Sequence, residues 1–78
     1  MPAELTPDER RAVGHTAAMF AQILRTQPSA DSVEVMSRTA SRLPFDYQCF
    51  RALMAAGYFR GMSIEDVIRE HGPEGRAA

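Results

Sequence analysis

The stretch FDYQCFRALMAAGYF, at positions 45–59, decides the fold of this chain. It holds all of the aromatic side chains except Phe20. Plotted at 3.6 residues per turn, its apolar positions cover nearly the whole circumference of a helix, and such a helix is either enclosed by its own fold or shared with a partner. The stretch therefore predicts a central helix over residues 45–60. Gly61 is expected to close it, because glycine readily adopts the positive φ found after a helix C-terminus.

Two apolar sectors run along this predicted helix. One holds Phe45, Cys49, Leu53 and Phe59, with two alanines; the other holds Tyr47, Phe50, Met54 and Tyr58. Two or three short helices cannot easily cover both sectors, so one is expected to meet another protein or a second copy of the chain. The expected core residues are Phe20, Phe45, Phe50 and Leu53. The candidate partner-binding residues are Tyr47, Arg51, Met54, Tyr58 and Phe59.

Two helices are predicted upstream. The first spans residues 7–26, because Thr6 and Glu9 have the spacing of a capping box and Pro7 suits the first helical position. The second spans residues 31–43, because Asp31 and Glu34 have N-cap and N3 spacing. The alternation of apolar residues around Glu34 is also compatible with a short strand, so residues 32–43 are open to either assignment.

A short last helix is predicted over residues 64–71. Ser63 and Asp66 form a second capping-box pattern, Glu65 and Arg69 have the spacing of an ion pair, and Gly72 ends the helix. Residues 72–78 are expected to be frayed. The fold class is therefore all-α, a small bundle of three helices plus a short C-terminal fourth helix in one domain, 1–78.

The composition excludes several classes of protein. The chain has 78 residues, a formal charge of −1, one Cys and 45% hydrophobic residues. These values argue against a strongly basic nucleic-acid binder, a disulfide framework and a disordered acidic tail. The absence of Lys and Asn is typical of a GC-rich genome, as in many bacteria and phages. No targeting segment or membrane span is visible, so a cytoplasmic protein without membrane contact is expected.

Few residues could carry chemistry. His15 and His71 are interpreted as a surface residue and a helix C-terminal residue, and Cys49 as a small core residue. No pair of potential ligands has the spacing of a metal site, and no glycine-rich phosphate loop is present. We therefore expect no enzymatic activity, no catalytic residues, no metal and no cofactor.

The arginines leave a nucleic-acid interpretation open. Arg38, Arg42 and Arg51 could form a basic patch, and the break at Gly61 could belong to a helix-turn-helix whose second helix is acidic. The sequence Arg42-Leu43-Pro44, followed by a helix and then GMSIEDVIRE at 61–70, resembles the ribbon-helix-helix family of dimeric DNA-binding repressors. That resemblance implies a short strand that ends in Arg42-Leu43-Pro44 and pairs across a dimer, with Arg38, Ala40 and Arg42 facing the bases.

The favoured interpretation is a small cytosolic adaptor or regulatory protein, monomeric or oligomeric, that binds another protein or itself through the apolar third helix. A dimeric DNA-binding regulator of ribbon-helix-helix or helix-turn-helix type is the alternative.

Overall fold

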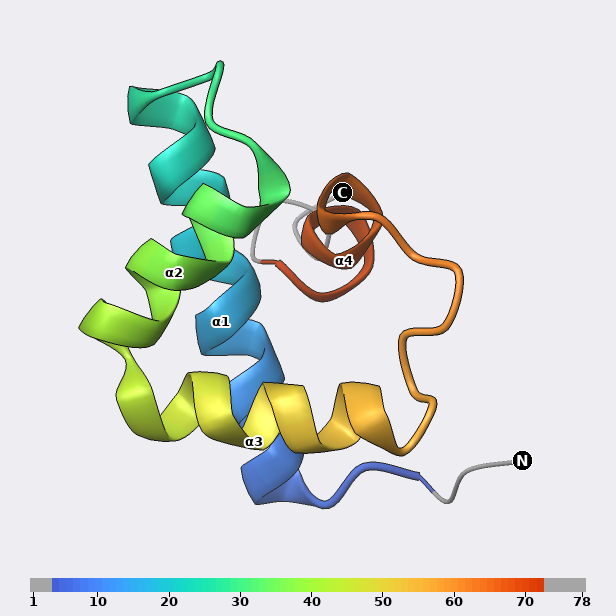
Figure 1. Cartoon of the computed structure of the whole chain (residues 1–78). Helices are drawn as coiled ribbons and strands as arrows, with labels where there is room; N and C mark the ends of the chain where they lie inside the picture. The colour runs from blue at the N-terminus through green and yellow to red at the C-terminus, as the bar shows by residue number, and fades with distance from the viewer. Residues whose placement is uncertain (1–3, 73–78) are drawn as a thin grey trace.

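Four helices form the fold in the computed structural model, which describes residues 4–72 (Figure 1). They are α1 (Pro7–Thr26), α2 (Ser32–Arg42), α3 (Pro44–Ala55) and α4 (Ile64–His71). No strand occurs within the described range 4–72. The predicted all-α bundle with a short C-terminal fourth helix is therefore confirmed. The bounds of α1 and α4 agree with those predicted, and those of α2 differ by one residue at each end.

Side-chain caps set the beginnings of three helices. The Thr6 hydroxyl accepts a hydrogen bond from the Glu9 amide at 3.1 Å, and the Glu9 carboxylate accepts one from the Thr6 amide at 2.8 Å. At α2 the Asp31 carboxylate accepts from the Glu34 amide at 2.8 Å. These caps satisfy amides that have no partner within the helix. They explain why local sequence patterns located these three helix beginnings.

The cap of α4 also holds a charge. Ser63 and Asp66 form the predicted capping box, and the hydrogen bonds from the Ser63 amide and hydroxyl hold the pKa of the Asp66 carboxyl below its usual range. Arg69 pairs with this same carboxylate, so the predicted pair with Glu65 is wrong. The three-residue spacing places Arg69 beside a carboxylate that the cap already fixes in position.

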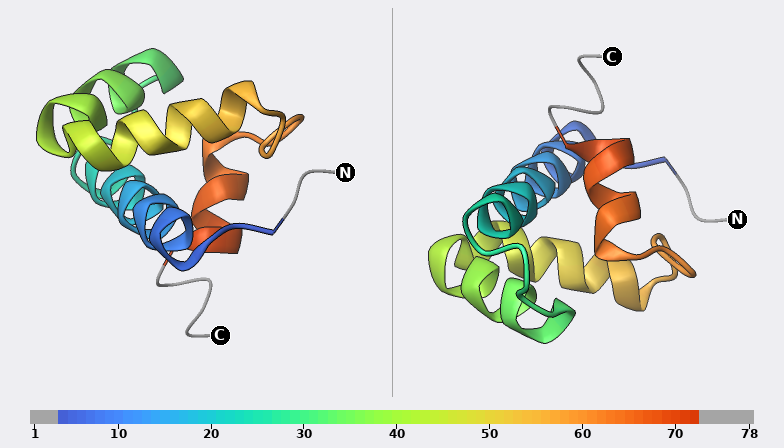
Figure 2. Two further views of the ribbon diagram at one scale, coloured as in Figure 1. Left: turned by 90° about the horizontal axis from the view of Figure 1, so that it is seen from below. Right: turned by 90° about the horizontal axis from the view of Figure 1, so that it is seen from above.

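α1 is the helix against which all three others pack. Figure 2 shows α2 and α3 on one side of α1 and α4 on another. At the centre, the rings of Phe20 and Phe50 meet edge to face at 5.5 Å, and Phe59 stacks on Phe50 at 4.7 Å. Val13 and Val35 lie in the same buried cluster. The expected burial of Phe20, Phe50 and Leu53 is confirmed.

α3 is shorter than predicted, because Gly57 rather than Gly61 is the residue that ends it. Gly57 has φ of 96°, and its amide donates to the Met54 carbonyl at 2.9 Å while the Tyr58 amide donates to the Leu53 carbonyl at 3.1 Å. This pair of bonds is the Schellman arrangement that terminates a helix at a glycine. Residues 56–61 therefore form a turn, which returns the chain toward the core at Phe59.

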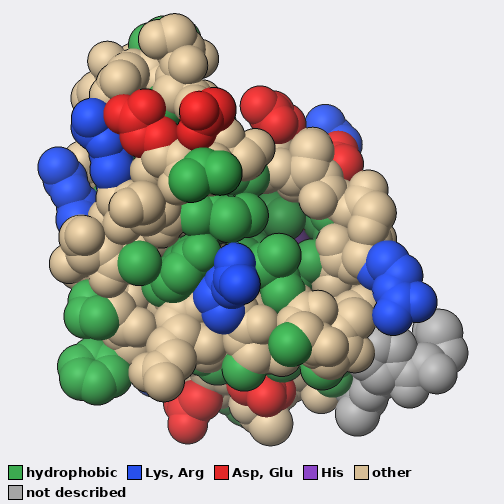
Figure 3. Space-filling model, viewed as in Figure 1, with side chains coloured by type: hydrophobic (Ala, Val, Ile, Leu, Met, Phe, Trp, Pro, Cys, Tyr) green, Lys and Arg blue, Asp and Glu red, His purple; other side chains and the backbone are tan. Residues whose placement is uncertain are grey.

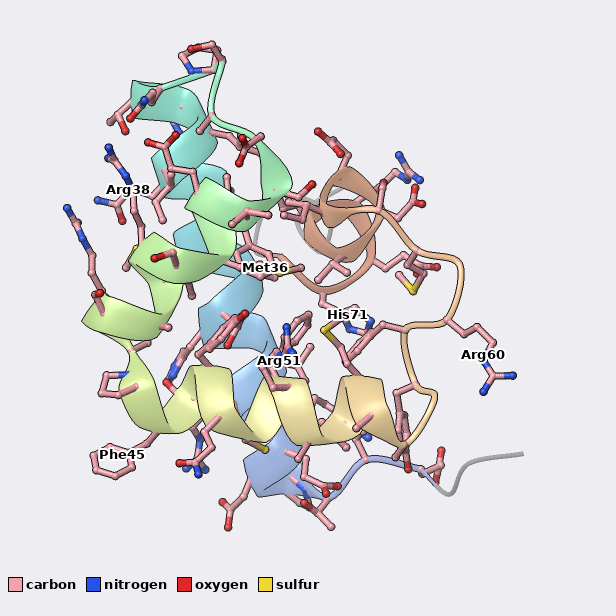
Figure 4. All side chains as sticks on the ribbon, in the orientation of Figure 1. Met36, Arg38, Phe45, Arg51, Arg60 and His71 are labelled. Atoms are coloured by element: carbon pink, nitrogen blue, oxygen red, sulfur yellow. The ribbon has the colours of Figure 1, made fainter. Side chains whose placement is uncertain are left out.

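The expected burial of Phe45 is wrong, because its side chain is 83% exposed. α3 buries the stripe that contains Phe50 and Leu53. Phe45 precedes Phe50 by five residues, and at 3.6 residues per turn it points about 140° away from Phe50. In Figure 4 it projects from the outer corner of the molecule.

Residues 38–42 belong to α2, so the strand required by the ribbon-helix-helix resemblance is absent and that resemblance is wrong for the fold. The helix persists because Val35 and Thr39, one turn apart, are buried together, and the Thr39 hydroxyl donates to the Val35 carbonyl at 2.7 Å. A strand would place residues four apart on one face without this bond.

The last described residue is Gly72, the C-cap of α4, whose amide donates to the Ile68 carbonyl at 2.8 Å. The rest of the predicted frayed tail, 73–78, lies outside the described residues. Between residues 4 and 72, no helix has both the length and the apolar character needed to span a bilayer.

Candidate functional site

An apolar surface opens between α2, α3 and α4 on the side of the molecule drawn in Figure 1. Figure 3 shows hydrophobic side chains gathered at its centre around one basic side chain, and Figure 4 identifies that side chain as Arg51 and places Met36 above it. We call the surface formed by Met36, Tyr47, Arg51 and Met54 the front face. Its three apolar members are only partly buried, and each packs against the core with its inner part.

The front face is open because of how the helices pack. α2 packs against both α1 and α3, whereas α4 packs against α1 and makes at most a slight contact with α2 or α3. A space therefore remains between α4 and the other two helices, and apolar side chains line it (Figure 3). No other described helix covers this side.

The phase of α3 determines which of its side chains reach the front face. Tyr47 and Met54 are four residues before and three residues after Arg51, so they lie within about 60° of it around the helix, on the side of the buried Phe50. The Tyr47 ring stacks on Phe50 at 6.2 Å. The aromatic core thus continues through Tyr47 to the open surface.

Arg51 is exposed at the centre of the front face without an ion pair to any carboxylate in the described part of the chain. Other arginines pair locally: Arg38 lies 2.9 Å from Glu34, and Arg11 lies 3.5 Å from Asp8. Arg60 points outward at the side of the same view (Figure 4). The front face therefore combines apolar area with one uncompensated positive charge.

The acidic side chains lie elsewhere. Most carboxylates of α2 and α4 lie at the N-cap or in the first turn, at Asp31, Glu34, Glu65 and Asp66, and Glu70 lies in the last turn of α4. Figure 3 shows acidic side chains along the upper edge of the molecule, over α4 and the beginning of α2, and others at the lower edge. The front face is thus acidic at that edge and basic where Arg51 stands on α3.

The structure brings together three of the five candidate partner-binding residues: Tyr47, Arg51 and Met54. Tyr58 is partly buried in the turn after α3, with its ring 6.5 Å from that of Phe59. Phe59 itself is buried between Phe50 and His71. Its side chain therefore belongs to the core and is not offered on the surface.

Met36 joins the front face although its sequence pattern indicates only the apolar stripe of α2. Its position beside α3 depends on the angle at which α2 and α3 meet across Leu43, which both helices share as a cap residue. No signal in the sequence encodes that angle directly. The helical pattern alone therefore does not predict that α2 contributes Met36 to this surface.

The three arginines of the nucleic-acid interpretation do not form a single patch. Arg38 lies on the outer side of α2, whereas Arg51 stands in the centre of the front face (Figure 4). Arg42 is exposed in the last turn of α2. The arginines of these two helices thus point in different directions.

A separate hollow of about 520 Å³ runs along α1 and ends at His71. Its lining residues are Pro7, Arg10, Arg11, Gly14, His15, Ala18 and His71. Both histidines of the chain therefore border one concavity, although they are far apart in sequence. His15 Nδ1 lies 3.0 Å from a carboxylate oxygen of Asp46, which links α1 to α3.

Cys49 is partly buried on α3. Burial raises the pKa of its thiol, and the nearby carboxylates of Glu9 and Asp46 raise it further. Since the thiolate is the reactive form, alkylation by iodoacetamide at pH 8 should be several-fold slower than that of glutathione. Timed alkylation followed by mass spectrometry measures this. A rate equal to that of glutathione, with the helices intact by circular dichroism, would contradict the prediction.

No group of three or more His, Cys, Asp or Glu side chains is placed to hold a metal ion within residues 4–72. Comparisons with protein families, with curated proteins and with solved structures found no match to this chain.

Proposed function

We propose that this chain is a small helical adaptor or regulatory protein that binds another protein through the front face. The observation that carries the proposal is the open apolar surface between α2, α3 and α4, with Arg51 at its centre (Figures 3 and 4). Aromatic residues, Met and Arg are the types enriched at the cores of protein interfaces. The front face consists of these types alone.

The shape of the surface suggests the mode of binding. The front face is an apolar surface bordered by α2 and α4, and an amphipathic helix can place its apolar side on such a surface. α3 is 12 residues long, or about 18 Å at 1.5 Å per residue, which matches about three turns of a bound helix. The two Met side chains of the front face can adapt to partners of irregular shape.

The charge distribution supports a protein partner more than DNA. The candidate reading helix α4 carries Glu65, Asp66 and Glu70 against Arg69, so it would repel phosphates. The other described arginines are spread over α1, α2, α3 and the turn after α3. DNA binding would need several of them on one surface.

Selection of a displayed library of helix-forming peptides, about 16 residues long, on the immobilised protein tests this proposal. We expect enriched peptides to shift the backbone amide resonances of Met36, Tyr47 and Met54 in the labelled protein. The Tyr47→Ala/Met54→Ala double variant should bind them at least about tenfold more weakly, equivalent to about 1.4 kcal/mol.

Phe45→Ala is the control, because it also removes an aromatic side chain from α3, but an exposed one on another side of the helix. It should leave peptide affinity unchanged. Failure to enrich any peptide would contradict the proposal, as would enriched peptides whose resonance shifts map to the hollow on α1 instead of the front face.

A further inference from the structure

From the charge of the front face, we infer that the partner segment is an amphipathic helix with an acidic side chain among its apolar anchors, and that Arg51 binds this carboxylate. The inference rests on the proposed function and specifies the chemistry of the partner. It follows from the position of Arg51 in the front face, from its apolar neighbours and from the lack of a carboxylate partner among the described residues.

Arg51 has apolar neighbours on the side of the buried Phe50. Tyr47 and Met54 lie on that side of α3, and Met36 lies opposite on α2 (Figure 4). On the other side of Arg51 lie the exposed Gln48 and Ala55. Within the described residues it has no carboxylate partner, whereas Arg38 and Arg11 have one each. Any helix that covers Tyr47 and Met54 must therefore also cover or closely approach the Arg51 guanidinium.

Covering an unpaired charge is costly. Removing an ion from water costs several kcal/mol unless a counter-charge and hydrogen bonds replace the lost solvation. A partner that is apolar throughout would remove the Arg51 guanidinium from water without supplying a counter-charge or hydrogen bonds. A Glu or Asp side chain facing it restores the balance, because the planar guanidinium can donate two parallel hydrogen bonds to one carboxylate.

A second copy of the chain is a poor occupant for the same reason. In a symmetric dimer whose two-fold axis passes through the centre of the front face, the two Arg51 side chains would approach one another. Like charges in a desolvated contact repel strongly. The electrostatics therefore favour a different protein with an acidic residue on its apolar side.

The charges at the edges suggest an orientation for the bound helix. Its acidic residue would face Arg51 on α3, and basic residues on its opposite flank would face the beginnings of α2 and α4, where Asp31 and Glu65 lie. The expected pattern is therefore a helix with apolar anchors at i, i+3 or i+4 and i+7, an acid on one border and a base on the other.

Parallel peptide selections on the wild-type protein and on the Arg51→Met variant test the inference. Arg51 is exposed, so this substitution should leave the fold intact, and circular dichroism verifies this. Wild-type selections should enrich Glu or Asp beside the apolar anchors, and selections on the variant should lose that preference. Replacing the enriched Glu by Gln should weaken binding to the wild type about tenfold or more. It should change binding to the variant less than twofold.

The outcomes separate the inference from the proposed function. Peptides that bind the front face of both proteins without any acidic preference would overturn the inference and leave the proposed function standing. An equal loss of peptide affinity for the wild type and for Arg51→Met, when the Glu of the peptide is replaced by Gln, would also overturn the inference. Arg51 would then not be the group that binds the acid. Absence of any enriched peptide would overturn both. A wild-type dimer in sedimentation that excludes the peptides would overturn the inference in favour of a second copy.

Discussion

Replacing Phe50 by alanine should lower the free energy of unfolding by about 3–5 kcal/mol, which is typical of a buried aromatic residue that leaves a cavity. Phe50 is 1% exposed, and its ring contacts those of Phe20, Phe59 and Tyr47. A chain of 78 residues is expected to have a total stability of about 4–12 kcal/mol. The substitution should therefore remove between about a quarter and all of the stability of the chain.

Urea denaturation followed by circular dichroism at 222 nm measures this loss. Phe45→Ala is the control, because it removes the same side chain from the same helix at a position that is 83% exposed. It should change the free energy of unfolding by no more than about 0.5 kcal/mol. Similar losses for the two variants would contradict the packing of α3 described above.

Replacing Gly72 by alanine should destabilise the protein by about 1–3 kcal/mol, as an overpacked site does. A Cβ atom at Gly72 would lie 2.6 Å from the Ile68 carbonyl oxygen, so the backbone at the end of α4 would have to move. That movement would also disturb the hydrogen bond from the Gly72 amide to the same carbonyl. Thermal unfolding should show a midpoint lower by about 4 °C or more.

Gly14→Ala is the matched control for Gly72→Ala. Gly14 lies inside α1, and its added Cβ atom would come no closer than 3.9 Å to the His71 carbonyl oxygen. Because alanine favours the helix by about 0.5–1 kcal/mol relative to glycine, this variant should be more stable than the wild type. If Gly72→Ala were neutral while Gly14→Ala raised the midpoint, the close approach at the end of α4 would be wrong.

The sequence was sufficient to predict elements whose signals are local. Thr6, Asp31 and Ser63 cap their helices through residues only three positions away, so their patterns identify the helix beginnings without knowledge of the fold. The burial of Phe20 and Phe50 followed from their positions on amphipathic or aromatic-rich helices.

The errors concern features that depend on packing between residues distant in sequence, namely the end of α3 and the direction in which its side chains point. Gly57 and Gly61 can both end a helix, and Gly57 does so in a fold that also stacks Phe59 on Phe50. An apolar stripe around most of a helix leaves its rotation undetermined, and this is why Phe45 was expected inside. Likewise, Tyr47, Arg51 and Met54 could be selected from the sequence, but Met36 joined them only through the arrangement of α2 beside α3.

The central position of α1 has a consequence for the order in which the chain becomes stable during synthesis. α1 is made first, but its partners for packing are made later, and α4 is made after all the others. Until α4 emerges, the side of α1 that receives it stays in contact with water, and Ile64 and Val67 have yet to join the core. The complete core therefore forms only after α4 has left the ribosome, because cooperative packing needs every helix that contributes to it.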